Sequence, residues 1–293
     1  MAGAGVLPGR AAAEARRQGW RVVAFAFEEA PGLAAAADVV VPAAINDIQA
    51  VVMRLYGERP QAALFVGKFW KQRAFEEADR ADQAARRLAD GGLSDAALAQ
   101  MVVTTLEGMG IDVLDQRGFL APSMAPPGVL TERAPTDPEW AEIRSGATLA
   151  RHLAEYGIGQ TVVRCFGVTV AVEAIEGTDE AIRRGARLSG PGAVVVKGVA
   201  RSHDYRFDIP AIGPTTVDAM AEGGVTALAV DAGRVLLVDR EDLVRRADAA
   251  GIAVVGLGIS PRSSSEDGYA QTARVVKAGK PVAITSSNTS TVQ

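Results

Sequence analysis

Residues 204–214 read DYRFDIPAIGP, so three charged side chains alternate with apolar ones directly before a turn containing proline and glycine. In an extended segment alternate side chains share one face, about 6.5–7 Å apart, which places Asp204, Arg206 and Asp208 side by side. A carboxylate can hold a cation or activate water, and a guanidinium can bind phosphate oxygens. The segment therefore has the parts of a diphosphate site, and a solvated charged face on a half-exposed strand is the alternative interpretation.

The residues that flank this segment point to anion binding as well. Gly213 and Pro214 form a turn that leads into a predicted helix at Thr215, and the N–H groups at a helix N-terminus favour an anion. Thr215 and Asp218 also have the spacing of a capping box. His203 lies next to the charged face, where an imidazole can contact phosphate.

A second acidic group lies in VEAIEGTD, residues 172–179. Glu173 lies at the end of a predicted strand, and Glu176 and Asp179 follow in the turn. Carboxylates gathered at strand ends can hold Mg²⁺, a hard cation that prefers oxygen ligands. Asp179 has a simpler explanation, because an acidic side chain in the first turn of a helix is stabilised by the helix dipole. Glu173 is therefore the better candidate for a metal ligand.

The N-terminal stretch AGAGVLPG, residues 2–9, resembles a dinucleotide-binding loop. Gly3 and Gly5 stand where backbone approaches a ligand, but Pro8 replaces the third glycine of the G-x-G-x-x-G pattern. Glu28 or Glu29, after the next predicted strand, is a candidate for the acidic residue that binds ribose in such sites. The strand that should precede the loop is missing, since the sequence begins at Met1. Either the start is trimmed or the sheet lacks its usual first strand.

A basic cluster follows the strand predicted at 62–67, in the sequence VGKFWKQRAF. Lys68, Lys71 and Arg73 come directly after this strand, and open α/β sheets bind ligands at the carboxyl ends of their parallel strands. Lys68 is therefore a candidate for substrate binding, with a solvated helix start as the equal alternative.

The elements that must position these residues alternate between strands and helices, which predicts an α/β fold with a mostly parallel sheet. Apolar runs bounded by turn residues predict strands at 21–27, 38–43, 62–67, 111–115, 192–198 and 252–257, and hairpins at 161–174 and 227–239. Helical spacing predicts helices at 9–19, 46–57, 94–110, 139–156, 179–188, 215–224 and 240–251. The proline-rich stretch 118–138 marks a boundary. We therefore expect a Rossmann-like parallel domain at 1–130, a mixed α/β (α+β) domain at 131–260 and a flexible tail at 261–293.

Composition excludes several classes of protein. The chain has 293 residues, of which 48% are hydrophobic, and a formal net charge of −4, so no strong positive field is present to gather nucleic acid. Cys165 is the single cysteine, which rules out an internal disulfide. No run of roughly 20 apolar residues predicts a membrane span, and no signal peptide is evident. A cytoplasmic protein is expected.

Long segments of the sequence resemble the LpxI-type UDP-2,3-diacylglucosamine pyrophosphatases. The likeness is strongest in YGIGQTVVRCFGVTVAVEAIEGTDEAI (156–182) and in DYRFDIPAIGPTTVDAMAEGGVTALAVDAGRVLLVDRE (204–241), and it includes AGAGVLP and LFVGKFWK in the first half. The motifs AVEAxEGTD and RxDxPxIGxxT are specific to that family, whereas the glycine loop is not. The likeness extends to about residue 258.

The resemblance implies a defined reaction. Such enzymes hydrolyse UDP-2,3-diacylglucosamine to UMP and 2,3-diacylglucosamine 1-phosphate in lipid A synthesis, by attack of water at the sugar-side phosphorus and with Mg²⁺ as cofactor. The essential aspartate of their RxDxP motif matches Asp208. The resemblance also implies two domains with the lipid between them, a homodimer and peripheral contact with the inner face of the membrane.

The site residues that follow from these observations fall into three groups. Asp208 and Arg206 are the expected catalytic residues, and Asp208, Glu173 and Glu176 are the expected Mg²⁺ ligands. Substrate contacts are expected from Gly3, Gly5, Lys68, Gln160, Thr178, Lys197 and Thr215. Two other functions stay open, namely a nucleotide- or lipid-binding protein without turnover and a phosphohydrolase that acts on a different UDP-linked sugar. Gly157 and the segment 200–203 depart from the family pattern and favour the binding protein.

Overall fold

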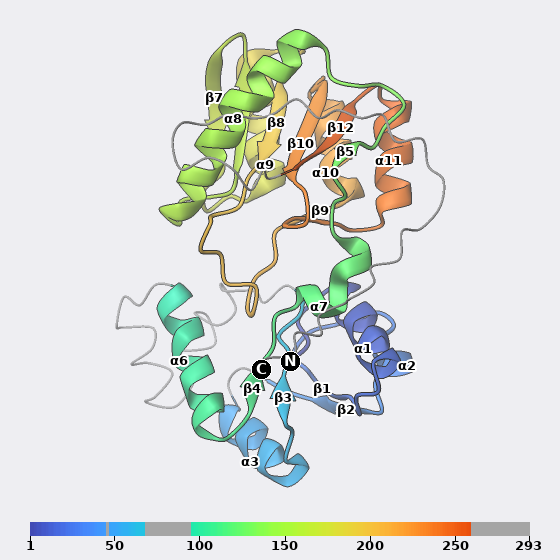
Figure 1. Ribbon diagram of the computed structural model, residues 1–293, viewed down its shortest axis with the longest axis vertical. Helices are drawn as coiled ribbons and strands as arrows, with labels where there is room; N and C mark the ends of the chain where they lie inside the picture. The colour runs from blue at the N-terminus through green and yellow to red at the C-terminus, as the bar shows by residue number, and fades with distance from the viewer. Residues whose placement is uncertain (45–46, 68–94, 259–293) are drawn as a thin grey trace, which may run out of the picture.

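The computed structural model describes residues 1–44, 47–67 and 95–258, which form two lobes along the long axis of the molecule (Figure 1). We call the elements from α1 to α7 the N-terminal lobe and those from β5 to β12 the C-terminal lobe. Lys68 and the predicted tail at 261–293 lie outside the described residues.

A six-stranded mixed sheet forms the centre of the C-terminal lobe, with the strand order β5-β12-β10-β8-β6-β7. The strands β8, β10 and β12 are parallel, and the other pairs are antiparallel. The central residues of β8, β10 and β12 are apolar because both faces of the sheet are covered at these strands. The strands are β5 (Gly128–Val129), β6 (Thr161–Cys165), β7 (Val168–Val172), β8 (Val194–Lys197), β10 (Ala227–Asp231) and β12 (Ala253–Leu257).

Helices cover both faces of this sheet, and alternate residues of β8 show how. Val194 and Val196 pack against α8 (Asp137–Glu155), whereas Val195 packs on the opposite face. That opposite face carries α9 (Thr178–Ser189), α10 (Pro214–Glu222) and α11 (Arg240–Ala249). Across residues 1–44, 47–67 and 95–258, every helix is too short or too polar to cross a bilayer.

The N-terminal lobe contains two pairs of parallel strands. β1 (Val23–Ala26) pairs with β2 (Val39–Pro42), and β3 (Ala62–Ala63) pairs with β4 (Asp112–Val113). Ala2 links the two pairs, because it forms parallel bridges with both Ala26 and Val66. The helices of this lobe are α1 (Leu7–Arg17), α2 (Leu33–Ala36), α3 (Ile48–Glu58), α6 (Asp95–Gly108) and α7 (Arg117–Leu120). The Rossmann-like sheet expected here stays a prediction, as do the domain limits.

The segment between the lobes ends in the C-terminal sheet. After α7 the chain forms the short 3-10 helix η1 (Ala121–Ser123) and then β5, which pairs with β12. β5 precedes the domain boundary predicted at residue 130.

Two expected strand arrangements are wrong. Residues 205–207 form a turn instead of a strand, because the Asp204 carboxylate accepts hydrogen bonds from the N–H and the guanidinium of Arg206. The predicted hairpin at 227–239 is also absent from the described structure. β11 (Leu236–Leu237) turns away from β10 and pairs in parallel with β9 (Ala211–Ile212), which lets both leucines become buried.

The capping box predicted at Thr215 and Asp218 is wrong as well. α10 begins one residue earlier, with Pro214 in its first turn and Gly213 as a cap without a side-chain bond. The Asp218 carboxylate instead accepts a hydrogen bond from Arg246 of α11, at 2.5 Å. A proline at the first position explains the start, because its fixed φ suits a helix and it lacks the N–H that a cap would satisfy.

A substitution at Gly185 of α9 tests how closely this helix packs on the sheet. A Cβ added at Gly185 would lie 2.7 Å from the Cβ of Val163 in β6. We expect Gly185→Ala to lower the free energy of unfolding by about 1–3 kcal/mol in urea denaturation, because overpacking outweighs the gain in helix propensity.

Gly57 of α3 is the matched control for this substitution. It is exposed, and a Cβ there would meet no atom within 4 Å. Gly57→Ala should therefore raise the free energy of unfolding by up to about 1 kcal/mol. Equal and favourable effects of the two substitutions would contradict the close packing of α9.

Candidate functional site

A buried lysine lies at the carboxyl end of β8 and gathers several predicted site residues. Lys197 is 4% exposed, and its Nζ lies 2.9 Å from Thr178 Oγ1 and 3.5 Å from Glu173 Oε2. Thr178 Oγ1 donates to Glu173 Oε1 at 2.7 Å, and Thr161 Oγ1 lies 3.3 Å from Nζ. We call Thr161, Glu173, Thr178 and Lys197 the Lys197 cluster.

The charge on Glu173 is stabilised inside this cluster. Burial raises the pKa of the Glu173 carboxyl, but the nearby Lys197 charge and hydrogen bonds from Thr161, Thr178 and the Gln160 N–H together hold the pKa below its usual value. Gly159 lets the backbone come close, since a Cβ there would lie 2.1 Å from the Glu173 carbonyl oxygen. Glu173 is therefore an ion-pair partner that holds the Lys197 ammonium in place.

Two helix N-termini meet beside the cluster. α9 begins at Thr178 and α10 begins at Pro214, and Thr216 Oγ1 donates to Asp179 Oδ1 at 2.7 Å. Thr215, predicted to contact substrate, is exposed in the first turn of α10. The N–H groups at such ends favour an anion, so the Lys197 cluster and Thr215 lie on a side of the sheet suited to phosphate.

The chain that leaves β8 forms a single loop at residues 198–210, which was not predicted from the sequence. Arg234 holds it: Nε donates to Tyr205 Oη at 3.0 Å, Nη1 donates to the Val199 carbonyl at 3.1 Å, and Nη2 donates to the Ala200 carbonyl. The Asp231 carboxylate, fully buried at the end of β10, accepts from the Val199 N–H at 2.9 Å.

Asp231 carries a further charge partner that sequence reasoning missed. Arg151 of α8 donates to Asp231 through Nε at 3.1 Å. One signal was available, because Asp231 is a single charge that ends the apolar run ALAV at the carboxyl end of a predicted strand. Carboxyl ends of parallel strands are the usual place for functional groups in α/β sheets.

The tip of the 198–210 loop contacts the N-terminal lobe. The Phe207 ring lies 5.0 Å from the Phe65 ring, centroid to centroid, and Arg206 Nη1 lies 3.6 Å from a Glu107 carboxylate oxygen in α6. Figure 1 shows this loop descending from the sheet toward the elements of the N-terminal lobe. The hydrogen bonds from Arg206 hold the pKa of Asp204 below its usual value. Arg206 is therefore engaged with two carboxylates.

Asp208 differs from its charged neighbours. Its side chain is exposed, and among the described residues no hydrogen bond or ion pair reaches its carboxylate. His203 Nε2 lies 3.1 Å from the backbone carbonyl oxygen of Asp208, which fixes the local backbone and leaves the side chain available. Asp208 can therefore accept a proton from water or contribute to a cation site.

The three expected Mg²⁺ ligands do not form a cage. Glu173 is paired with Lys197, and Glu176 is paired with Arg184 at 2.5 Å. Within the described ranges, no three His, Cys, Asp or Glu side chains are grouped to hold a metal ion. Asp208 alone fits, because Mg²⁺ commonly takes one or two carboxylates together with substrate phosphates and water.

The glycine loop lies at the end of the N-terminal strands, before α1. The Gly3 N–H donates to the Val66 carbonyl at 2.8 Å, and Gly5 has a φ of 100°, which favours glycine. A Cβ at Gly67 would lie 2.8 Å from the Gly3 carbonyl, so these segments are in close contact. Because Phe65 touches Phe207, the loop and the Asp208 segment approach the same interlobe region.

Both lobes match models of a known protein family. Residues 1–122 match the family model of the LpxI N-terminal domain, and residues 126–255 match that of the LpxI C-terminal domain. The chain is also 33% identical over 173 residues to the UDP-2,3-diacylglucosamine pyrophosphatase LpxI of Caulobacter vibrioides. That match covers 56% of this chain and 61% of the Caulobacter protein, less than two thirds of its length.

The ion pair between Lys197 and Glu173 gives a prediction on stability. We expect Lys197→Met to lower the free energy of unfolding by about 3–5 kcal/mol, because it leaves the Glu173 carboxylate buried without its cation. The double variant Lys197→Met/Glu173→Gln should lose less than the sum of the two single variants. Urea denaturation at pH 7 measures all three.

The pH dependence has a defined sign. The pKa of Glu173 is lowered by folding, so its contribution to stability is present above the unfolded-state pKa of about 4.3 and is lost as pH falls through the lower folded-state value. In Lys197→Met the Glu173 carboxyl loses the cation that lowers its pKa, so this loss of stability at low pH should become smaller. Additive single-variant effects with unchanged pH profiles would contradict the pairing.

Arg234 gives a second prediction. Arg234→Lys cannot reproduce the hydrogen bonds to Tyr205, Val199 and Ala200, so we expect a loss of about 1–3 kcal/mol and faster amide exchange in residues 199–208. Exposed Arg187 is the control, and Arg187→Lys should change neither quantity. Unchanged exchange in Arg234→Lys would show that the loop is held by other contacts.

Proposed function

The chain belongs to the LpxI family, and from this premise we propose that it hydrolyses UDP-2,3-diacylglucosamine to UMP and 2,3-diacylglucosamine 1-phosphate, a step of lipid A synthesis. The observation that carries the proposal is Asp208, an exposed carboxylate without a partner among the described residues, on a loop that is anchored in one lobe and contacts the other.

Asp208 has two chemical roles open to it in this reaction. As a general base it takes a proton from the water that attacks the sugar-side phosphorus. The bond between this phosphorus and the bridging oxygen breaks, and UMP leaves with that oxygen. As a metal ligand it helps to hold Mg²⁺, which when bound supplies positive charge to the diphosphate oxygens. Asp208 fits either role, whereas Glu173 and Glu176 do not fit the second because each is paired with a cation.

The other residues are assigned to binding. Thr178 and Thr215 lie at helix N-termini, where the N–H groups favour diphosphate oxygens. Lys197 Nζ bonds to Thr178, and the Gln160 N–H donates to Glu173 of the same cluster. Arg206 steadies the diphosphate from the loop tip. In this proposal the N-terminal lobe is Rossmann-like, and Gly3 and Gly5 of its glycine loop, together with Lys68, contact the substrate. The parallel strands and the start of α1 support that assignment.

The proposal also states where in the cell the enzyme works. A substrate with two acyl chains resides in a bilayer, so the protein works in the cytoplasm, in peripheral contact with the inner face of the membrane.

We also propose a homodimer. β7 is an edge strand, and exposed apolar side chains lie on or beside it, among them Phe166 (88% exposed) and Ile175 (103%), which supports a contact with a second copy.

A nucleotide- or lipid-binding protein of the same fold is the second candidate, as is a phosphohydrolase of a different UDP-linked sugar. The pairing of Glu173 with Lys197 and of Glu176 with Arg184 favours the binding protein, because it removes two expected metal ligands. Such a protein would gain thermal stability from the UDP-sugar without releasing UMP.

Asp208→Asn tests the proposed reaction. We expect UMP release from UDP-2,3-diacylglucosamine with Mg²⁺ to fall at least about 100-fold, because the amide neither accepts the proton nor carries the charge. Asp137→Asn, an exposed aspartate at the start of α8, should keep full activity. The melting temperature should be the same in both variants and the parent.

Two results would decide against parts of the proposal. Full activity in Asp208→Asn would remove Asp208 from the chemistry while leaving the reaction in place. A folded parent that binds the substrate and releases no UMP would establish the binding protein instead.

A further inference from the structure

Two short turns with the same residue pattern join the lobes. Residues 115–117 read Asp-Gln-Arg at the start of α7, and residues 204–206 read Asp-Tyr-Arg in the loop after β8. In each turn the aspartate carboxylate accepts hydrogen bonds from the N–H and from the guanidinium of the arginine two residues on. The middle residues bond to each other, since the Gln116 N–H donates to the Tyr205 carbonyl at 3.2 Å. The loop that carries Asp208 is therefore bonded to the N-terminal lobe through its backbone.

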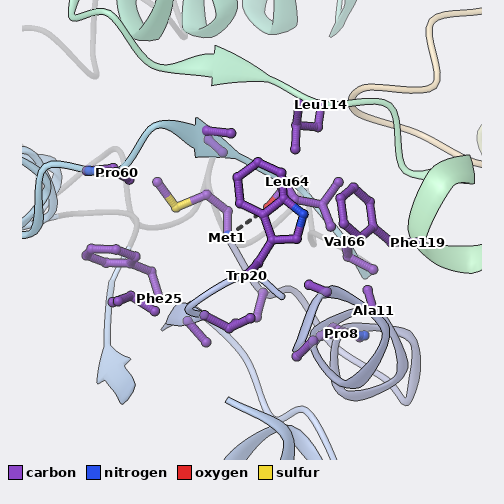
Figure 2. Close-up of a pocket in the computed structure, with 18 of the residues that line it drawn as sticks. Met1, Pro8, Ala11, Trp20, Phe25, Pro60, Leu64, Val66, Leu114 and Phe119 are labelled. Carbon is purple, nitrogen blue, oxygen red and sulfur yellow. Dashed lines mark hydrogen bonds between the residues drawn. The ribbon is translucent and has the colours of Figure 1, made fainter. Parts of the chain in front are cut away.

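The turn at 115–117 is fixed within the N-terminal lobe on both sides. Before it, the Leu114 N–H donates to the Ala63 carbonyl of β3 at 2.9 Å, and after it the Phe119 side chain is buried. Leu114 and Phe119 both line the apolar pocket of this lobe (Figure 2). Arg117 therefore extends from a backbone that is held by packing and by hydrogen bonds.

The Arg117 guanidinium lies over the Tyr205 ring. Its central carbon is 3.9 Å from the ring centroid, which is a cation–π contact. Asp115 fixes the plane of this guanidinium, because its Oδ2 accepts from Nε at 3.0 Å and from Nη2 at 2.5 Å. Burial raises the pKa of the Asp115 carboxyl, but hydrogen bonds from Arg117 hold the pKa below its usual value, so the carboxylate stays charged. The N-terminal lobe therefore sets both the position and the orientation of Arg117 over the ring.

The Tyr205 ring contacts His203, and His203 contacts the backbone of Asp208. The rings of Tyr205 and His203 are 4.6 Å apart, centroid to centroid, at an interplanar angle of 76°, which is an edge-to-face contact. His203 Nε2 in turn lies 3.1 Å from the carbonyl oxygen of Asp208. A continuous series of contacts thus leads from the N-terminal lobe to the backbone of Asp208, in the order Asp115, Arg117, Tyr205, His203 and Asp208.

We propose that Arg117 and Tyr205 are positioning residues, which place the Asp208 carboxylate for hydrolysis by holding the His203 imidazole against the Asp208 backbone. The inference rests on the proposed function, because the position of Asp208 matters only if Asp208 acts in that reaction. Arg117 and Tyr205 act through His203, so they are not catalytic residues themselves. A displacement of about 1 Å can lower the rate of an enzyme by about 100-fold, so contacts of this kind are strong enough to affect turnover.

The ring of Tyr205 has a role that its backbone does not share. The bond from Gln116 uses the Tyr205 carbonyl and can form with any side chain at this position. The Asp208 carboxylate has no partner among the described residues, so its position depends on backbone contacts such as the one from His203. Loss of the ring should therefore leave the lobes joined while it frees the His203 imidazole.

Arg117→Met tests the first contact in the series, because methionine removes the charge and the planar group. We expect kcat for UMP release from UDP-2,3-diacylglucosamine with Mg²⁺ to fall about 10-fold with KM unchanged, since substrate binding is not altered. Arg21→Met is the matched control. Arg21 also binds a carboxylate of the N-terminal lobe, with Nη1 3.0 Å from Glu58 Oε2, and its loss should leave kcat at the parent value.

Tyr205 offers a rescue by a conservative variant. Tyr205→Leu removes the ring, and we expect the same fall in kcat of about 10-fold. Tyr205→Phe keeps the ring and loses only the hydrogen bond from Arg234, whose bonds to the Val199 and Ala200 carbonyls remain. Its kcat should stay within about 2-fold of the parent value. The double variant Arg117→Met/Tyr205→Leu should lose no more activity than Tyr205→Leu, because both changes break the same series of contacts.

Hydrogen exchange provides a readout that needs no turnover. The His203 N–H donates to the Ala200 carbonyl at 3.1 Å, and the Arg206 N–H donates to the Asp204 carboxylate at 3.0 Å. Both amides are hydrogen-bonded within the loop, so their exchange rates report how firmly the loop is held.

Exchange at these two amides should become about 2- to 5-fold faster in Arg117→Met and Tyr205→Leu, which corresponds to the loss of one cation–π contact. The rates in Tyr205→Phe and Arg21→Met should stay close to those of the parent. If the parent releases no UMP, the proposed function fails, and exchange then decides separately whether Arg117 and Tyr205 hold the loop.

Three outcomes would overturn the inference. Unchanged kcat and exchange in Arg117→Met and Tyr205→Leu would show that the series of contacts does not hold Asp208. A lower melting temperature in Tyr205→Leu, with kcat kept, would show that the ring only stabilises the fold. A higher KM at unchanged kcat would assign Arg117 and Tyr205 to substrate binding instead.

Discussion

A buried carboxylate at the carboxyl end of β10 fixes the geometry of the candidate site. Asp231 is fully buried, accepts a hydrogen bond from the Val199 N–H and is paired with Arg151 of α8. A buried charge is tolerated only when it is paired and hydrogen-bonded, so these partners have little freedom to move. Asp231 thereby sets where the chain leaves β8, and with Arg234 it sets the course of the 198–210 loop.

The extent of the apolar core explains why the polar groups of the site lie at the ends of strands and helices. One apolar cluster extends from Ala11 and Val66 of the N-terminal lobe to Leu243 of α11, and it contains the inner face of the C-terminal sheet. Polar groups are therefore concentrated at strand and helix ends around it, where the members of the Lys197 cluster bond to one another and Asp231 bonds to Arg151 and the Val199 N–H. The sheet supplies rigid positions, and the loops and helix starts supply the chemical groups.

Local sequence patterns predicted most helices and strands. The roles of the site residues depend instead on contacts with residues that are distant in sequence. The apolar runs located β1, β2, β8 and β12 to within a few residues. For β8 and β12 the reason is that a strand buried on both faces must be apolar. The alternation at 204–209 gave the wrong backbone, since the carboxylate of Asp204 forms a turn with Arg206 two residues on. Glu173 was singled out as a metal ligand, whereas its pairing with Lys197 depends on the order of strands, which periodicity does not contain. Asp231 was missed for the same reason.

The 198–210 loop has both ends in one lobe and its tip on the other. Its ends are fixed by Asp231, Arg234 and β9, while Phe207 packs on Phe65 and the Gln116 N–H donates to the Tyr205 carbonyl. Asp208 directly follows Phe207 in the chain, so its position depends on contacts made in both lobes, and an aromatic ring pair far from the sheet helps to determine where this carboxylate lies.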